Sequence, residues 1–272
     1  MSSNENVIDF DAHRKRQERI GLVLPRQMAN SGSKPFLGLA SNGDTYWCKR
    51  FESPHGPEAV INEVVASITG ETIGAQIRPW RIIHVPQSLS DTLITSDHNP
   101  TDRYRIGKLP LFGSLNLHTS DVCTSPAVIP HVTDDANINH IPKILALWDL
   151  CCVHDDHQLL IDYDADNQLW SIDHGFWFDS FERPWAYGPP EAKGATPDLP
   201  MLRGYIPHEC WNKASTAVDA LDKNLFTTIF DQLPAEWDVD KNKVSNLVDY
   251  ILTRKPFTLS RLEQFRKTNG RK

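Results

Sequence analysis

The sequence predicts an α+β protein of two lobes, a small β-rich N-lobe and a helical C-lobe. Strand-like runs surround a single helix-like run up to residue 112, and helix-like repeats fill the chain after residue 213. With 272 residues, the chain is long enough for two lobes around a cleft. We expect a flexible polar tail at 1–33, the N-lobe at 34–112 and the C-lobe at 113–272.

Composition and charge argue against several classes of protein. The formal net charge of −7 makes a dedicated nucleic-acid binder unexpected, and no apolar run reaches the roughly 20 residues of a membrane span. The five cysteines are odd in number and show no CxxC spacing, which disfavours a disulfide framework or a zinc site. Such cysteine usage is typical of the reducing cytoplasm, where we expect the protein.

The first strand pair is predicted at 36–51, where an Asn-Gly pair at 42–43 is a strong signal for a two-residue hairpin turn. On the return strand, Lys49 shares a face with two aromatic residues, Trp47 and Phe51. A lysine there either meets an anion such as a phosphate or extends over the aromatic rings to water. The strand alone leaves both interpretations open.

The clearest helix is predicted at Pro57–Gly74, with proline in the first turn and glycine at the C-terminal end. Valine and isoleucine residues repeat at helical spacing along it, and Glu63 lies off the centre of that apolar stripe. Glu63 is therefore expected either to reach sideways into a cleft or to be solvated. Two further strands follow at Arg78–Val85 and Asp91–Thr95, then a linker at Tyr104–Leu115.

The next region, at 114–139, has no clear period and is expected to be a loop or insertion. After it, a helix at Ile141–Cys152 leads into a cluster of acids and histidines. Two short strands follow, Leu159–Asp162 and Gln168–Ile172, and the second runs directly into Asp173. Further helices are expected at Ala214–Phe230, Val244–Leu252 and Leu259–Phe265.

This order of helix, polar loop, hairpin and acid before a glycine is the geometry that phosphoryl-transfer enzymes of the protein-kinase type need. In such enzymes an aspartate of the loop orients the acceptor hydroxyl, and an aspartate after the hairpin holds the metal ion. The hairpin lysine and the helix glutamate precede them in the order that such enzymes use.

With these elements in place, the chain resembles the HipA-like kinases, most closely the short forms that lack the extra N-terminal module. The resemblance covers roughly residues 34 to 265. It is carried by KPFLGLASNGDTYWCKRF, GPEAVINEVVASITGETIGAQI and LLIDYDADNQLWSIDHGFWF, and by the C-terminal LPAEWDVDKNKVSNLVDYILTRK.

The resemblance implies a protein-kinase-like fold and an ATP- and Mg²⁺-dependent transfer of phosphate to a hydroxyl of a protein or a small molecule. Lys49 would bind the α- and β-phosphates, Glu63 would position Lys49, Asp155 would orient the acceptor and Asp173 would hold Mg²⁺. The loop expected to cover the nucleotide contains Gly38, Asn42 and Gly43.

The catalytic loop departs from the family pattern, in which an Asn that binds the second metal ion follows the aspartate. An ungapped alignment puts Leu160 at that position, whereas deleting two residues puts Gln158 there. We prefer the gapped alignment, because Leu159–Asp162 then forms the next strand. The shortened loop leaves open whether Asp155 or Asp156 is catalytic. It also leaves open a second function, a nucleotide-binding pseudokinase that regulates a partner.

A different chemistry is a transition-metal site, since histidine and carboxylate ligands suit Zn²⁺ or Fe²⁺. That interpretation leaves the lysine and the helix glutamate unexplained. Its candidate ligands are His154, Asp155, Asp156, His157, Asp173 and His174.

Overall fold

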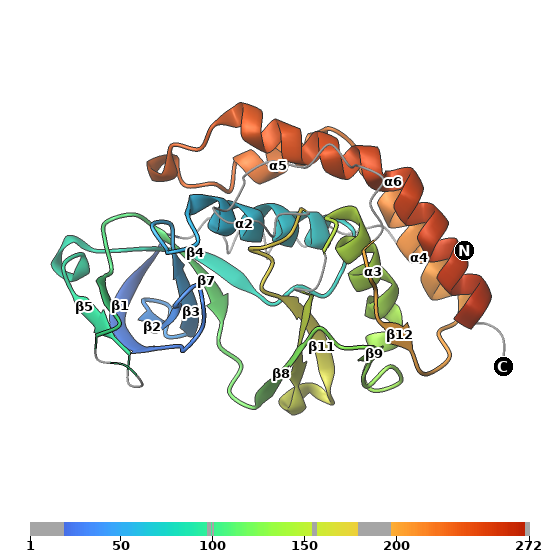
Figure 1. Cartoon of the computed structure of the whole chain (residues 1–272), viewed down its shortest axis with the longest axis horizontal. Coiled ribbons are helices and arrows are strands. Elements are labelled where there is room, and N and C mark those ends of the chain that lie inside the picture. The colour runs from blue at the N-terminus through green and yellow to red at the C-terminus, as the bar shows by residue number, and fades with distance from the viewer. Residues whose placement is uncertain (1–18, 97–98, 100, 154–156, 179–196, 270–272) are drawn as a thin grey trace. The chain divides into compact units, whose positions relative to one another are not determined.

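The computed structural model describes residues 19–96, 99, 101–153, 157–178 and 197–269. The chain forms two compact units. The first contains the described residues before 55 together with 79–116, and the second contains 55–78 and the described residues from 117 onward. The mixed α+β content confirms the α+β part of the predicted fold class (Figure 1).

The first unit is built around a closed five-stranded barrel of order β1-β2-β3-β7-β4. Its strands are β1 (Ile20–Met28), β2 (Phe36–Ala40), β3 (Thr45–Arg50), β4 (Trp80–His84) and β7 (Leu111–Leu115). Neighbouring strands are antiparallel except β1 and β4, which are parallel and close the barrel. A separate hairpin joins β5 (Leu93–Thr95) to β6 (Arg103–Arg105), after the short 3₁₀ helix Gln87–Leu89.

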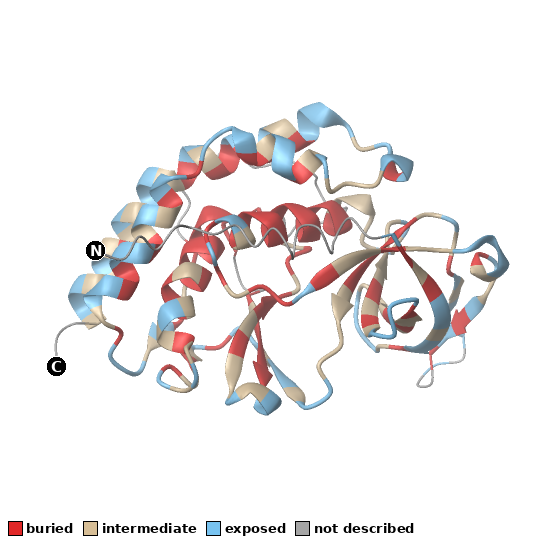
Figure 2. Ribbon diagram, turned by 180° about the vertical axis from the view of Figure 1, so that it is seen from behind, coloured by how far each residue is buried: buried red, intermediate tan, exposed pale blue. Residues whose placement is uncertain are grey.

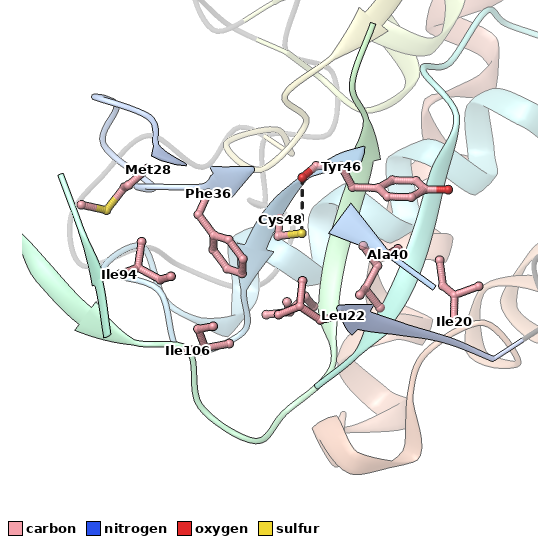
Figure 3. Packing of buried hydrophobic residues seen from close by; sticks show 11 residues of the cluster. Ile20, Leu22, Met28, Phe36, Ala40, Tyr46, Cys48, Ile94 and Ile106 are labelled. Carbon is pink, nitrogen blue, oxygen red and sulfur yellow. Dashed lines mark hydrogen bonds between the residues drawn. The ribbon is translucent and has the colours of Figure 1, made fainter. Parts of the chain in front are cut away.

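Alternation along the strands gives this unit its core. Successive residues of a strand point to opposite faces, so Tyr46 and Cys48 of β3 are buried inside the barrel while Trp47 and Lys49 lie on the other face and are half-buried. Figure 3 shows Phe36, Cys48 and other apolar side chains gathered there. The barrel is therefore held mainly by hydrophobic burial.

Two expectations from the sequence differ from the observed structure of this unit. Ile20–Met28 was expected in the polar tail, but forms β1. Tyr104–Leu115 was expected to be a linker, but contains part of β6 and all of β7, which lies between β3 and β4. Pro110 and Gly113 read locally as loop signals. Gly113 in fact faces the barrel interior, where a Cβ would lie 2.3 Å from the Ile83 Cδ1 atom.

The described part of the second unit combines five helices with short strands. The described helices are α2 (Pro57–Thr72), α3 (Asn137–Leu150), α4 (His208–Asp219), α5 (Asn224–Phe230) and α6 (Lys241–Asn269). The strands β8 (Ser120–Thr124), β10 (Gln158–Asp162) and β11 (Gln168–Ile172) form a sheet of order β11-β10-β8. A two-residue strand β9 (Val128–Ile129) pairs with β12 (Met201–Leu202), and 3₁₀ turns lie at Tyr163–Ala165 and Ala235–Trp237.

The predicted helices at 57 and 141 and the hairpin before Asp173 are confirmed. The helix α2, however, groups with the second unit rather than with the barrel. Strands β8 and β9 fill part of the expected loop at 114–139, and α6 is one helix where two were expected. Among the described residues, no helix has the length and apolar character that crossing a membrane requires.

The helix α2 is buried on every side between Ala59 and Gly70, as the red ribbon in Figure 2 shows. A helix with a single apolar stripe would leave its other face to water. Glu63 therefore does not lie at the edge of a solvated face, and its side chain is 3% exposed. A buried carboxylate needs hydrogen-bond partners, and Glu63 accepts a hydrogen bond from the backbone N–H of His174.

Candidate active site

The lysine predicted to bind phosphate, Lys49, lies on β3 opposite Phe112 of β7, on the face that points away from the barrel core. The neighbouring Trp47 donates its indole N–H to the side chain of Asn116 at 3.0 Å, which fixes the ring on that face. Because Lys49 belongs to one unit and Glu63 to the other, their pairing stays a prediction.

The hairpin turn before Lys49 is stabilised by its own residues. The Asn42 amide donates to Asp44 at 2.8 Å and to the Tyr46 hydroxyl at 3.0 Å. Gly43 has φ +88°, a conformation that glycine adopts without strain. Gly38 is buried, and a Cβ there would lie 2.8 Å from a Leu22 methyl group. Packing and turn geometry thus account for both glycines, and their contact with a nucleotide stays a prediction.

The strands β10 and β11 bring Gln158 and Asp173 together. Gln158 pairs with Ile172, so its side chain lies beside Asp173, the residue that follows Ile172. The Gln158 Nε2 atom donates to the Asp173 Oδ2 atom at 3.2 Å. A half-turn of the amide would present its oxygen in place of this nitrogen. Leu160 is buried in the middle of the same sheet and pairs with Trp170.

The Asp173 residue has φ +59°, in the left-handed region. Non-glycine residues adopt that conformation at a cost, and it persists where the surrounding structure holds it. The next backbone N–H, that of His174, donates to the Glu63 Oε2 atom at 3.1 Å. The Gly175 carbonyl accepts from the Asn62 amide at 3.0 Å. Two adjacent residues of α2 therefore bind the two residues after Asp173.

The remaining catalytic candidates, Asp155 and Asp156, lie outside the described residues, as does His154. Within the part of the chain that the structure describes, no group of three or more His, Cys, Asp or Glu side chains is arranged to hold a metal ion. Both ring nitrogens of His174 lie near serine hydroxyls, at 3.2 and 3.3 Å, and His157 is buried against the Trp148 ring. These contacts disfavour the histidine–carboxylate metal site.

Asp173 and Gln158 carry side-chain oxygens of the kind that the kinase interpretation expects at this position. Mg²⁺ prefers oxygen ligands, usually one or two carboxylates together with phosphate oxygens and water. A half-buried carboxylate beside a side-chain amide fits that preference. Cys151, at the end of α3, is not a candidate nucleophile, because burial raises the pKa of its thiol well above the usual range.

Sequence reasoning missed three polar residues of this region: Asn62, Ser67 and Ser171. Ser67 lies one helical turn after Glu63 and therefore on the same face of α2. Two polar side chains at that spacing, on a helix rich in valine, isoleucine and alanine, were the available signal. The contact of Asn62 with Gly175 joins residues 113 positions apart, and the contact of Ser171 with Trp148 joins residues 23 positions apart, so neither has a signature in the local sequence.

Among the comparisons with known proteins, only the one with solved structures finds similar proteins, and it concerns the fold of this chain. No protein-family model matches this chain, and no curated protein matches it in sequence. Among solved structures, hydra Fam20 with sugar aligns over 96% of this chain and 91% of its own, with a TM-score of 0.55 and 9% identity. This likeness shows that the two chains share a fold.

Two further solved structures are similar at a lower level. The Golgi casein kinase aligns over 99% of this chain and 77% of its own, with a TM-score of 0.49 and 11% identity. The same kinase with Mn/ADP bound aligns over 97% of this chain and 77% of its own, with a TM-score of 0.48 and 11% identity.

Proposed function

We propose that this protein is an ATP- and Mg²⁺-dependent phosphotransferase that resembles the HipA-like serine/threonine kinases. The observation that carries the proposal is the Gln158 amide 3.2 Å from the Asp173 carboxylate, at the end of a hairpin that follows α3. That contact supports the gapped alignment, in which Gln158 replaces the usual asparagine. The burial of Leu160 inside the sheet supports it as well.

The roles follow from placement and charge. Asp173 and Gln158 would hold the metal ion, and the bound ion would neutralise charge that develops on the transferred phosphoryl group. Lys49 would bind the α- and β-phosphates, and Asp155 or Asp156 would orient the acceptor hydroxyl. The acceptor is a hydroxyl of a protein or a small molecule, and the cytoplasm stays the expected compartment.

Incubation with ATP labelled on the γ-phosphate, with and without Mg²⁺, tests the proposal. We expect label on a protein or small molecule, and we expect Asp173→Asn to abolish its metal-dependent formation while leaving the fold intact. Asp164→Asn is the matched control, because Asp164 is exposed at the far end of the same hairpin. Equal transfer by wild type and Asp173→Asn would rule out the assignment of Asp173 as metal ligand.

The alternative function is a nucleotide-binding pseudokinase, and the replacement of asparagine by Gln158 favours it. Glutamine has one more rotatable bond than asparagine, so its oxygen is less well preorganised for a metal ion. A pseudokinase would show an ATP-dependent rise in melting temperature without transfer of label. In an active enzyme, Gln158→Asn should keep or raise the rate, whereas Gln158→Leu should abolish turnover and retain nucleotide binding.

A further inference from the structure

The His174 side chain makes polar contacts in two directions. Its Nε2 atom lies 3.2 Å from the Ser171 hydroxyl on β11. Its Nδ1 atom lies 3.3 Å from the Ser67 hydroxyl on α2 and 3.5 Å from the Glu63 Oε2 atom. The side chain is 3% exposed. The imidazole ring therefore bridges the strand that leads into Asp173 and the helix α2.

The hydrogen atoms of this network can be assigned consistently. The Trp148 indole N–H donates to the Ser171 hydroxyl oxygen at 3.0 Å, and an indole has no acceptor. Ser171 can then donate its own hydrogen to the His174 Nε2 atom. In that arrangement the neutral ring carries its hydrogen on Nδ1 and donates it towards Ser67 and Glu63. Each member of this buried network then has a partner.

The backbone beside His174 lies close to α2 as well. The His174 N–H donates to Glu63, and Asn62 donates to the next carbonyl, that of Gly175. A Cβ on Gly175 would lie 3.3 Å from the Ala59 carbonyl oxygen, so the loop backbone nearly touches the helix. The strained φ of Asp173 is thus followed directly by contacts that can hold it.

We propose that His174 is a positioning residue that ties the Asp173 loop to α2 and so fixes the direction of the Asp173 carboxylate. The role towards a metal ion rests on the proposed function, whereas the tie between loop and helix does not. Groups that hold a ligand in place from outside the coordination sphere affect metal affinity strongly, typically 10–100-fold.

The competing explanation is that His174 only fills space. Its ring packs against Trp177 with centroids 4.3 Å apart. His174→Phe keeps an aromatic ring and removes both nitrogens, so it separates the two explanations. His174→Asn replaces the ring and keeps a polar atom near the Nδ1 position. Trp177→Phe is the matched control, because it alters the packing and leaves the polar contacts.

The first experiment measures Mn²⁺ binding to the full chain in the presence of ADP, from the electron paramagnetic resonance signal of free Mn²⁺. We expect His174→Phe to weaken Mn²⁺ binding by about 10–100-fold, His174→Asn to restore part of the loss, and Trp177→Phe to remain within a few-fold of wild type. Equal losses in His174→Phe and Trp177→Phe would overturn the proposal in favour of simple packing.

The second experiment follows hydrogen–deuterium exchange at 172–178 without metal or nucleotide. We expect faster exchange in His174→Phe and in Ser67→Ala than in wild type. Unchanged exchange in His174→Phe would overturn the tie to α2, and faster exchange with unchanged Mn²⁺ affinity would overturn the positioning role. A wild type that binds no Mn²⁺ with ADP would refute the proposed function, and the exchange result would still decide whether the tie exists.

Discussion

The two units of the molecule are stabilised by different kinds of contact near their candidate functional residues. In the first, Lys49 is carried on the outside of a barrel whose inside is apolar, with Phe36 and Cys48 fully buried. In the second, the residue after Asp173 and the end of α3 are held by buried polar groups, including Glu63 and Asp149. Apolar cores tolerate repacking, whereas a buried polar network fails when one partner is lost. Substitutions in the two units should therefore differ in cost and in kind.

The largest expected effect is at the pair of Asp149 and Arg254, which joins α3 to α6. The Arg254 Nε atom donates to the Asp149 carbonyl at 2.7 Å, and its Nη2 atom lies 3.3 Å from the Asp149 carboxylate. Both residues are buried. Arg254→Met leaves the carboxylate buried without this partner, and we expect a loss of about 3–5 kcal/mol in the free energy of unfolding.

Urea denaturation measures that loss, and Arg266→Met is the matched control. Arg266 forms a half-exposed pair with Glu263, at 2.7 Å on the surface of the same helix. Exposed ion pairs contribute little, so the control should unfold close to wild type. Similar midpoints for the two variants would show that the buried pair does not fix α6 to α3.

The second prediction concerns overpacking of the barrel. An alanine at Gly113 places a Cβ 2.3 Å from the Ile83 side chain and 3.2 Å from the Tyr46 Cβ atom. Something must shift, and we expect a loss of about 1–3 kcal/mol. Gly113→Ala combined with Ile83→Val should recover part of that loss, because the second change removes the closest methyl group. Equal stability of the single and double variants would contradict the packing explanation.

The same contrast explains what the sequence could predict. The hairpin turn at Asn42 and Gly43 and the helix α2 follow from residues within a few positions of one another, and both were predicted. Strand β7 was missed because its partners, β3 and β4, lie far away in the chain. In β1, Pro25 and the exposed Val23 and Leu24 obscure the alternation. In the closed barrel, β7 lies between β3 and β4. Local periodicity does not indicate that the barrel closes.

In the candidate site, too, some contacts follow from nearby residues and others depend on residues far away in the chain. Placing Gln158 and Asp173 at one end of a hairpin needed only the strand period and the turn, and the two side chains do lie together. The contacts of Glu63 with His174 join residues 111 positions apart. From the sequence, Glu63 was expected to pair with Lys49 by family resemblance. His174 was considered only as a ligand of the alternative transition-metal site. Loop closure over such a length has no local signal.

The third prediction uses pH to examine the barrel core. Burial raises the pKa of the Cys48 thiol well above its usual range. Above the usual thiol pKa, near 9, the unfolded chain loses this proton while the folded chain keeps it, so the folded state binds more protons and stability falls as pH rises. The slope contributed by one such thiol approaches about 1.4 kcal/mol per pH unit.

Denaturation between pH 8 and 10.5 tests this contribution by comparing wild type with Cys48→Ala. The variant is expected to start from lower stability, because it loses buried volume, and to decline less steeply with pH. Cys151→Ala should act in the same direction, since burial also raises the pKa of that thiol. Identical slopes in wild type and Cys48→Ala would mean that water reaches the thiol.

The smallest expected effect is at the hairpin turn, and it separates local from distant determinants most cleanly. Gly43 has φ +88°, and a Cβ there would meet no atom within 4 Å. Gly43→Ala therefore pays no packing penalty and only the backbone cost of a left-handed residue, about 1 kcal/mol. Gly43→Asn should cost less than Gly43→Ala, because asparagine tolerates this conformation better. A loss in Gly43→Ala as large as that in Gly113→Ala would show that the turn depends on surrounding structure after all, and the distinction between a locally specified turn and a loop fixed from a distance would not hold.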